Sequence, residues 1–130
     1  SELDAVRGSV DALLGGLVRS EGPLTWVGIG GTITALVAVE LGLAPYDPSK
    51  VHGSNLTVDQ VAGLVQRLGD LPVSERRFVP GLDPKRADVI VTGGCIVQRL
   101  LAWSGAYQTC VSDRGVRWGL AIELGSPTLF

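Results

Sequence analysis

The sequence predicts an α/β fold that is rich in helices and has a small sheet. Apolar residues recur at helical spacing in several segments, which is typical of amphipathic helices. Two short β-prone runs, residues 24–29 and Gln108–Ser112, stand far apart in the chain with helical segments between them. Hydrophobic residues make up 45% of the 130 residues and charged residues 18%. The chain is therefore long and apolar enough to bury a core.

Charge and hydropathy argue against several classes of partner. The formal net charge is -2, whereas a nucleic-acid-binding module normally carries a basic patch. The most apolar stretch, residues 33–44, is interrupted by Thr34, Glu40 and Gly42, and it is too short to span a membrane. The first four residues have neither the basic nor the apolar region of a signal peptide. We therefore expect a cytoplasmic protein that binds neither nucleic acid nor membranes.

The chain holds two cysteines, Cys95 and Cys110, and one histidine, His52. Their spacing fits no metal-binding motif. We expect two buried thiols in a reducing cytoplasm, with a disulfide only if the fold brings the two together. No metal ligands are expected in this chain.

The first third of the chain predicts a helix at residues 2–18, a strand and a second helix. The strand, at residues 24–29, is short and expected to be buried. Gly30 and Gly31 end the strand and open the second helix. Gly42 is expected to end that helix in the left-handed conformation. The apolar face of the second helix is expected to consist of Ile33, Leu36, Val37 and Leu41.

The middle of the chain predicts a loop and two helices. Residues 44–55 hold two prolines and show no periodicity, which indicates a loop. Thr57 and Gln60 form a capping-box pattern, in which the Thr57 hydroxyl accepts from the Gln60 amide and the Gln60 side chain reaches back. A short helix is expected at residues 72–78. The helix after the capping box has an apolar face made of Val58, Val61, Leu64, Val65 and Leu68.

Two interpretations compete for residues 84–104. The β-branched run from Val89 to Thr92 favours a strand, whereas apolar residues keep a helical period from Ala87 to Leu101. We expect one long helix over residues 84–104, with Asp83 as its N-cap. Close packing or a kink is expected where two glycines, Gly93 and Gly94, follow each other.

The second strand, Gln108–Ser112, is followed by a turn and a last helix at residues 116–124. Together with the first strand it makes a βαβ unit, whose two strands run parallel in one sheet. A two-stranded sheet is marginal alone, so further strands are expected from residues outside this chain or from another chain. The chain begins with Ser1 rather than Met, and we expect it to be cut from a longer protein.

Several short segments, ordered over roughly residues 26–120, carry a family signature. They are Gly28-Ile29-Gly30-Gly31-Thr32, Tyr46-Asp47-Pro48-Ser49-Lys50-Val51-His52-Gly53, Glu75-Arg76-Arg77, Pro80-Gly81-Leu82, Arg86-Ala87-Asp88-Val89-Ile90 and Val111-Ser112-Asp113-Arg114-Gly115. Each is weak alone, but the ordered set is hard to obtain by chance. The set resembles the Ppx/GppA phosphatases, the family of exopolyphosphatases and guanosine pentaphosphate phosphohydrolases.

The resemblance implies a partial ribonuclease-H-like domain of the actin, sugar kinase and heat-shock chaperone superfamily, where two such domains face each other across a phosphate-binding cleft. In this family the catalytic glutamate and the first phosphate loop lie in the N-terminal domain. A second loop, Asp-x-Gly-Gly-Gly-Ser, opens the second domain, and neither motif occurs in this chain. Residues 1–130 are therefore expected to be the C-terminal fragment of the second domain, with the missing N-terminal domain of the same chain as partner.

The family chemistry, as the resemblance implies it, removes the terminal phosphate from polyphosphate or guanosine pentaphosphate. A glutamate activates water, Mg²⁺ balances phosphate charge, and backbone N–H groups hold the anion. Only the last role has candidates in this chain: Gly30, Gly31 and Thr32 open a helix, where free N–H groups favour an anion. The same glycines could equally serve close packing of the helix on the strand. No catalytic residue is expected here, and the isolated fragment should be inactive.

Three polar residues, His52, Asp113 and Arg114, are candidates for supporting the site. We favour a hydrogen-bonded loop anchor for His52 and a structural pair or helix cap for the other two. Family members continue Leu-Arg-Glu-Gly after Gly115, where this chain has Val-Arg-Trp-Gly. Trp118 therefore indicates packing or a contact surface in the last helix. Three more residues could meet a polyanion or be solvated on the surface, namely Arg76, Arg77 and Arg86.

Two functions follow from the sequence. The first is part of a phosphatase acting on terminal phosphoanhydride bonds, and the second is a non-catalytic interaction or regulatory module that retains the fold. A small-molecule kinase of the same superfamily is disfavoured by the segments at residues 46–53 and 112–115. The open edge of the first strand further predicts self-association of the fragment.

Overall fold

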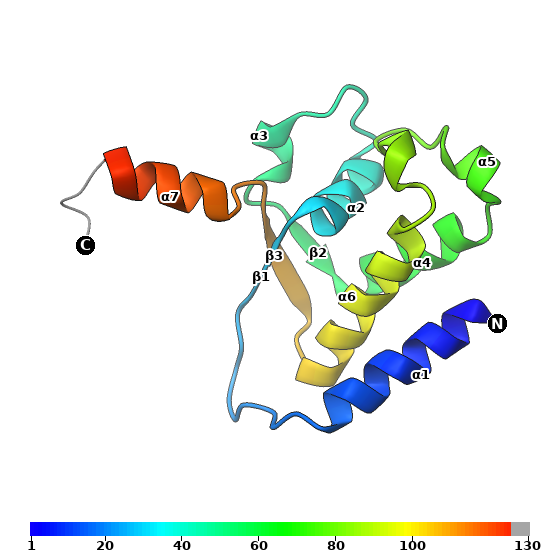
Figure 1. The fold of residues 1–130 in the computed structure, drawn as a ribbon, viewed down its shortest axis with the longest axis vertical. Helices are drawn as coiled ribbons and strands as arrows, with labels where there is room; N and C mark the ends of the chain where they lie inside the picture. The colour runs from blue at the N-terminus through cyan, green and yellow to red at the C-terminus, as the bar shows by residue number, and fades with distance from the viewer. Residues whose placement is uncertain (126–130) are drawn as a thin grey trace.

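A computed structural model describes residues 1–125 of the chain, and Figure 1 shows the order of its elements. Their bounds are α1 (Glu2–Gly15), β1 (Trp26–Ile29), α2 (Gly31–Leu41), α3 (Pro48–Val51), β2 (Asn55–Thr57), α4 (Val58–Gly69), α5 (Val73–Arg76), the 3-10 helix η1 (Pro84–Arg86), α6 (Ile90–Ser104), β3 (Gln108–Ser112) and α7 (Val116–Gly125). The helix-rich α/β class is confirmed.

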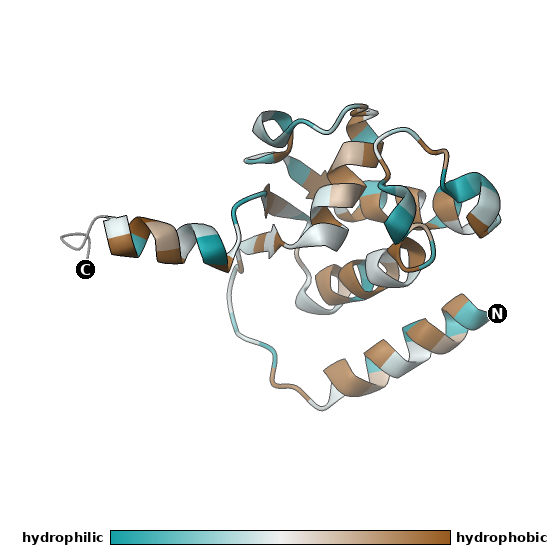
Figure 2. Cartoon of the chain, turned by 45° about the horizontal axis from the view of Figure 1, so that its top comes forward, coloured by the Kyte–Doolittle hydropathy of each residue, from teal (hydrophilic) through white to brown (hydrophobic). Residues whose placement is uncertain are grey.

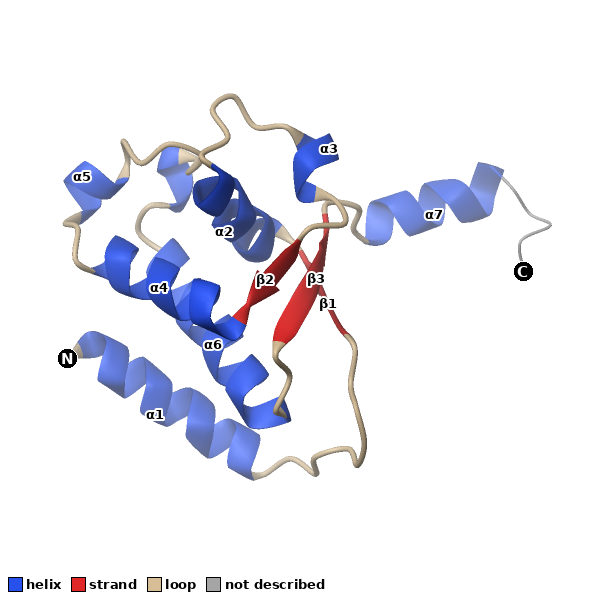
Figure 3. Ribbon diagram, turned by 180° about the vertical axis from the view of Figure 1, so that it is seen from behind, coloured by secondary structure: helices blue, strands red, loops and turns tan. Residues whose placement is uncertain are grey.

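The sheet has three strands in the order β1-β3-β2, with helices α1, α2, α4 and α6 on one side of it (Figure 3). Strand β1 runs parallel to β3, and Trp26 lies opposite Thr109 in this pair. This pairing confirms the predicted parallel strands. Strand β2 runs antiparallel to β3, with Leu56 opposite Thr109. The sequence predicted only two strands in this chain. Strand β2 is a third strand, which this chain itself supplies.

The core lies where α2, α4 and α6 pack together. Leu36 of α2, Leu64 of α4 and Ile90 of α6 are almost completely buried, and each such side chain contributes roughly 1.5–3 kcal/mol. A Cβ at Gly94 would lie 2.9 Å from Val65 Cγ2. The glycine therefore lets α6 approach α4 closely, which confirms the close packing predicted at this position.

Two local predictions are confirmed in detail. The Gln60 amide donates to the Thr57 hydroxyl at 3.1 Å, and the Thr57 amide donates to Gln60 Oε1 at 2.9 Å, which completes the capping box. Gly42 ends α2 with φ 62, in the left-handed region where glycine is unstrained.

The predicted loop at residues 44–55 is wrong in part, because it contains α3 and begins β2. Asp47 caps α3 by accepting from the Ser49 amide at 3.0 Å, and Pro48 occupies the first turn. The three-residue strand β2 has no periodicity of its own to reveal it. It exists because β3 offers a free edge for pairing.

Other predicted bounds also need correction. Residues 84–104 are not one helix, because η1 ends at Arg86 and α6 begins at Ile90. Helix α1 ends at Gly15, three residues before the predicted end. The predicted apolar face of α2 included Leu41, which is 52% exposed. Strand β1 is not buried as predicted, since Val27 and Ile29 point to the open face of the sheet.

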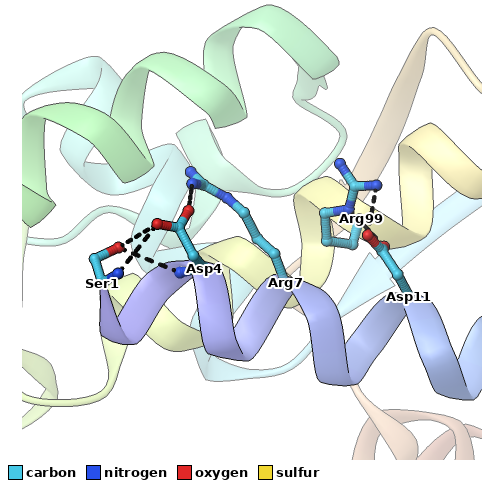
Figure 4. Close-up of polar contacts among 5 residues, drawn as sticks. All are labelled: Ser1, Asp4, Arg7, Asp11 and Arg99. Atoms are coloured by element: carbon cyan, nitrogen blue, oxygen red, sulfur yellow. Dashed lines mark hydrogen bonds and ion pairs between the residues drawn. The ribbon is translucent and has the colours of Figure 1, made fainter.

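Helix α1 joins the rest of the chain through α6. Arg99 of α6 donates from Nε and Nη2 to the two carboxylate oxygens of Asp11, at 2.7 and 2.9 Å (Figure 4). The same figure shows the first turn, where Ser1 and Asp4 form a second capping box. Both cysteines are free. No helix within residues 1–125 has the length and apolar character needed to cross a bilayer.

Candidate functional site

The candidate site lies at the carboxyl ends of β1 and β3. Because these strands are parallel, the segments that follow them emerge at the same edge of the sheet, where ligands commonly bind in α/β folds. Strand β1 leads into Gly30 and Gly31, and β3 leads into Asp113. Between them lies a hollow of about 520 Å³, lined by Gly30, Gly31, Thr34, Arg86, Asp113, Gly115, Arg117 and Trp118.

One wall of the hollow is the N-terminus of α2. Gly30 is its N-cap with φ 96, a conformation that favours glycine, and no side chain caps this end. The first N–H groups of a helix have no partner within the helix and carry a partial positive charge. Residues of α2 from Ala35 to Val39 are buried, so the direction of the helix is fixed by the core. The open end therefore offers rigid donors to an anion.

The Arg86 side chain lies directly against this helix end. A Cβ at Gly31 would overlap the Arg86 guanidinium, so only glycine leaves this space for it. Arg86 is half-buried, and its guanidinium has no hydrogen bond or ion pair to any residue in the range 1–125. A cation beside the positive end of a helix is unfavourable without a negative partner. The two features together favour an anion at this position.

Asp113 is held by the loop that leads to α3. The Tyr46 hydroxyl donates to the Asp113 carboxylate, across 67 positions of the chain. Partial burial of the phenol and the neighbouring carboxylate raise the pKa of Tyr46 to about 12. The phenol therefore stays protonated and keeps donating, which fixes Asp113 at the edge of the hollow.

His52 lies beside the site rather than in it. Its Nδ1 lies 3.3 Å from Ser112 Oγ, at the end of β3. Next to it, the Gly53 amide donates to the Val111 carbonyl at 2.8 Å, and the Val111 amide donates to the Ser54 carbonyl at 2.8 Å. His52 is exposed and belongs to this junction between loop and strand. This placement fits the loop-anchor interpretation.

The side chains of Arg114 and Thr32 both make contacts other than with the hollow's helix end. The Arg114 guanidinium lies 4.9 Å from the centre of the Trp118 ring, in cation–π contact. Thr32 turns its side chain to α6, where a Cβ at Gly93 would lie 2.7 Å from Thr32 Cγ2. Only the backbone N–H of Thr32 remains to face an anion.

The three arginines named from the sequence lie in different environments. Arg76 is 8% exposed and donates to three backbone carbonyls, so it is a structural residue. Arg77 is exposed and does not line the hollow. Arg86 is the one at the site. The sequence named Arg86 as one of three arginines that could meet a polyanion, but nothing in it distinguished Arg86 from the other two. In the structure Arg86 lies in η1, which Asp83 caps.

A second hollow of about 490 Å³ adjoins the first and shares Gly31, Thr34 and Arg86 with it. Arg86 thus stands between two compartments. The second compartment has mainly apolar and proline walls, with Tyr46 and Asp83 as its other polar lining residues. Its remaining lining residues are Ala35, Leu43, Ala44, Pro45, Gly81, Leu82 and Pro84.

The Mg²⁺ that the resemblance implies does not fit a ligand set within residues 1–125. No group of three or more His, Cys, Asp or Glu side chains gathers there. Asp113 is the single carboxylate on the hollow, and it already accepts from Tyr46. The donors on the hollow therefore suit an anion, and a metal ion would need ligands from elsewhere.

Comparisons with known proteins show the family of the chain. The model of the Ppx/GppA phosphatase family matches residues 2–125. Exopolyphosphatase 2 of Mycobacterium tuberculosis is 32% identical over 104 residues, which cover 77% of this chain and 33% of that protein. A bifunctional 3-dehydroquinate synthase/phosphatase of Fusobacterium nucleatum is 32% identical over 97 residues, covering 75% of this chain and 14% of that protein.

Solved structures show the same fold. The Ppx/GppA family member of Aquifex aeolicus superposes with a TM-score of 0.89 at 32% identity, covering 99% of this chain and 42% of that chain. An exopolyphosphatase-like protein with 24% identity superposes with a TM-score of 0.83 over 98% of this chain. The chain spans about a third of the length of the curated exopolyphosphatase it matches. It belongs to the Ppx/GppA phosphatase family.

Proposed function

We propose that this chain is the C-terminal fragment of the second domain of a phosphatase that hydrolyses terminal phosphoanhydride bonds of inorganic polyphosphate or guanosine pentaphosphate. Within it, these residues hold a phosphate group. The observation that carries the proposal is the Arg86 guanidinium, which lies against Gly31 at the open N-terminus of α2 without a negative partner among residues 1–125. Family membership supports the reaction class.

The site positions and neutralises a phosphate group. Backbone N–H groups at the start of α2 donate to phosphate oxygens, and Arg86 adds charge-assisted hydrogen bonds. Arg117, which also lines the hollow, adds a second positive charge. Donors that are fixed before the ligand arrives cost no reorganisation as charge develops on the phosphate. Activation of water requires a base from outside this chain, and we propose that Mg²⁺ is held there too.

The two substrates would use the two hollows differently. Both carry a terminal phosphate for the Arg86 site. Only guanosine pentaphosphate has a ring system that could enter the adjoining compartment walled by Pro45 and Pro84. The relative rates on the two substrates therefore test how that compartment is used.

The proposal is tested by replacing Arg86 in the longer protein. The Arg86→Ala variant should lower kcat/KM about 10- to 100-fold, since a hydrogen bond to a charged group contributes about 1.5–3 kcal/mol. Phosphate release from polyphosphate and from guanosine pentaphosphate measures it. The control is Arg77→Ala, an exposed arginine outside the hollow. Equal effects of the two variants, or none, would contradict the proposal. Binding of both ligands without phosphate release would instead identify the alternative, a non-catalytic binding module.

A matched glycine pair separates binding from packing. Gly31→Ala pushes the Arg86 guanidinium aside, and because that is the free end of a flexible side chain, the melting temperature should change little. Phosphate release should fall at least tenfold by the same loss of hydrogen bonds. The control Gly63→Ala lies on α4 with open space around it, and its activity should be unchanged. A large loss of stability in Gly31→Ala would favour the packing interpretation.

A further inference from the structure

We infer that Asp113 determines which phosphate group the hollow accepts, by accepting a hydrogen bond from the hydroxyl of a terminal phosphate. The inference rests on the proposed phosphate site and adds a selectivity to it. Asp113 is half-buried and lines the hollow together with Arg86 and Arg117. It belongs to the segment between β3 and α7, whose hydrophilic colouring Figure 2 shows.

A carboxylate is an unexpected group on a site for an anion, because like charges repel each other. The start of α2, Arg86 and Arg117 all favour negative charge in the hollow. Asp113 does not serve to hold these arginines, since no ion pair joins it to an arginine in the part of the chain that the structure describes. The carboxylate therefore remains available to act on the ligand.

One oxygen of this carboxylate is held in place and the other is open. The Tyr46 hydroxyl donates to Asp113 Oδ1, and the raised pKa of Tyr46, about 12, keeps the phenol a donor at neutral pH. Asp113 Oδ2 has no hydrogen bond to any residue between Ser1 and Gly125. A carboxylate oxygen can only accept. A ligand that satisfies Oδ2 must therefore bring its own proton.

Terminal and internal phosphate groups differ in this proton. A terminal phosphate has two acidic oxygens, like a phosphate monoester, in which the second proton has a pKa of about 6. A neighbouring carboxylate favours the protonated form, so a terminal phosphate in the hollow can donate its hydroxyl to Asp113. An internal phosphate has one acidic oxygen, which is ionised at neutral pH, and meets only repulsion there. Asp113 thus selects the end of a phosphate chain.

Inorganic phosphate and sulfate are matched probes, because they have the same shape and only phosphate carries a hydroxyl at neutral pH. Calorimetric titration of the longer protein should show that phosphate binds at least about tenfold more tightly than sulfate. Asp113→Asn removes the repulsion and offers an N–H donor, so this variant should bind sulfate about 10- to 100-fold more tightly than the wild type. The control Asp88→Asn removes the same charge from an exposed residue outside the hollow and should keep the preference for phosphate.

Cyclic trimetaphosphate extends the test to condensed phosphates, because its ring has no terminal group. The wild type should bind it at least about tenfold more weakly than Asp113→Asn does. Tyr46→Phe, which frees Asp113 from its anchor, should lower the preference for phosphate over sulfate less than Asp113→Asn.

The outcomes separate this inference from the proposed function. Equal binding of phosphate and sulfate by the wild type would overturn the role of Asp113, even if the Asp113→Asn variant did not fold. An unchanged preference in a folded Asp113→Asn variant would overturn it too. If Arg86→Ala weakens phosphate binding in either case, the proposed phosphate site stands alone. A wild type that binds neither anion would contradict the site itself and the inference with it.

Discussion

Replacing Arg76 should destabilise the chain more than replacing an exposed arginine beside it. The buried guanidinium donates from Nε to the Leu68 carbonyl at 2.8 Å, from Nη2 to Leu71 at 2.8 Å and from Nη1 to Ala87 at 2.6 Å. It thus joins the end of α4 to the segment between η1 and α6. Arg86, the last residue of η1, directly precedes Ala87, so Arg76 holds the backbone next to the proposed phosphate site.

The magnitude follows from the three hydrogen bonds. Each bond to a charged donor contributes about 1.5–3 kcal/mol, and carbonyls left without a partner add a desolvation cost. The cost of burying the guanidinium offsets part of this gain. We expect Arg76→Ala to lower the free energy of unfolding by about 3–4 kcal/mol. With roughly 3–4 °C per kcal/mol for a chain of this size, the melting temperature should fall by about 9–16 °C.

Urea unfolding followed by circular dichroism measures this change, with Arg77→Ala as the matched control. Arg77 is the next residue along the chain and is exposed, so its replacement should stay within about 0.5 kcal/mol. Arg76→Lys keeps the charge, but one ammonium group cannot span three carbonyls, and about 2 kcal/mol should still be lost. If Arg76→Lys matched the wild type, charge rather than the planar fork would be the stabilising feature. If Arg76→Ala and Arg77→Ala were alike, the reasoning from burial would be refuted.

Three further predictions concern ionisation, activity and association. The pKa of Tyr46 is raised from 10.0 to about 12, so the stabilisation by the neutral phenol is complete below pH 10 and lost as the pH rises through 12. Absorbance titration should show this late ionisation, and Tyr46→Phe should lack it; ionisation of Tyr46 near pH 10 would contradict the assigned contact. The 130-residue chain alone should release no phosphate from polyphosphate with Mg²⁺, and release that is lost in Arg86→Ala would contradict this. Because β1 is an edge strand with Val27 exposed, the chain should self-associate in light scattering and Val27→Lys should weaken this; a monomer at high concentration would refute it.

The elements predicted best from the sequence were those with their own local signal. The capping box of Thr57 and Gln60 located the start of α4 correctly, because both partners lie within one turn. The β-branched run at Val89 was correctly assigned to a helical region, since the helical period continued beyond it. Strand β2 was missed, because three residues hold no pattern and the strand depends on β3, some fifty positions away.

Of the candidate site, the sequence indicated only the part that is made of backbone groups. Gly30 and Gly31 were identified because a glycine pair between strand and helix has a local meaning. Arg86 and Tyr46 reach the site from other segments, and no spacing in the sequence shows that their side chains meet Gly31 and Asp113. Arg76 was grouped with the surface arginines, since a single arginine does not reveal the three carbonyls that bury it.

The parallel pairing of β1 and β3 also constrains synthesis on the ribosome. The Thr109 hydroxyl donates to the Trp26 carbonyl across 83 positions of the chain. At 5–20 residues per second, roughly 4–17 s pass between the emergence of the two strands. During that interval the edge of β1 that later pairs with β3 is still unpaired, although α2 and α4 have already emerged from the ribosome. Nascent chains on neighbouring ribosomes could then pair through β1, and a chaperone that shields extended segments would act on this stretch before β3 arrives.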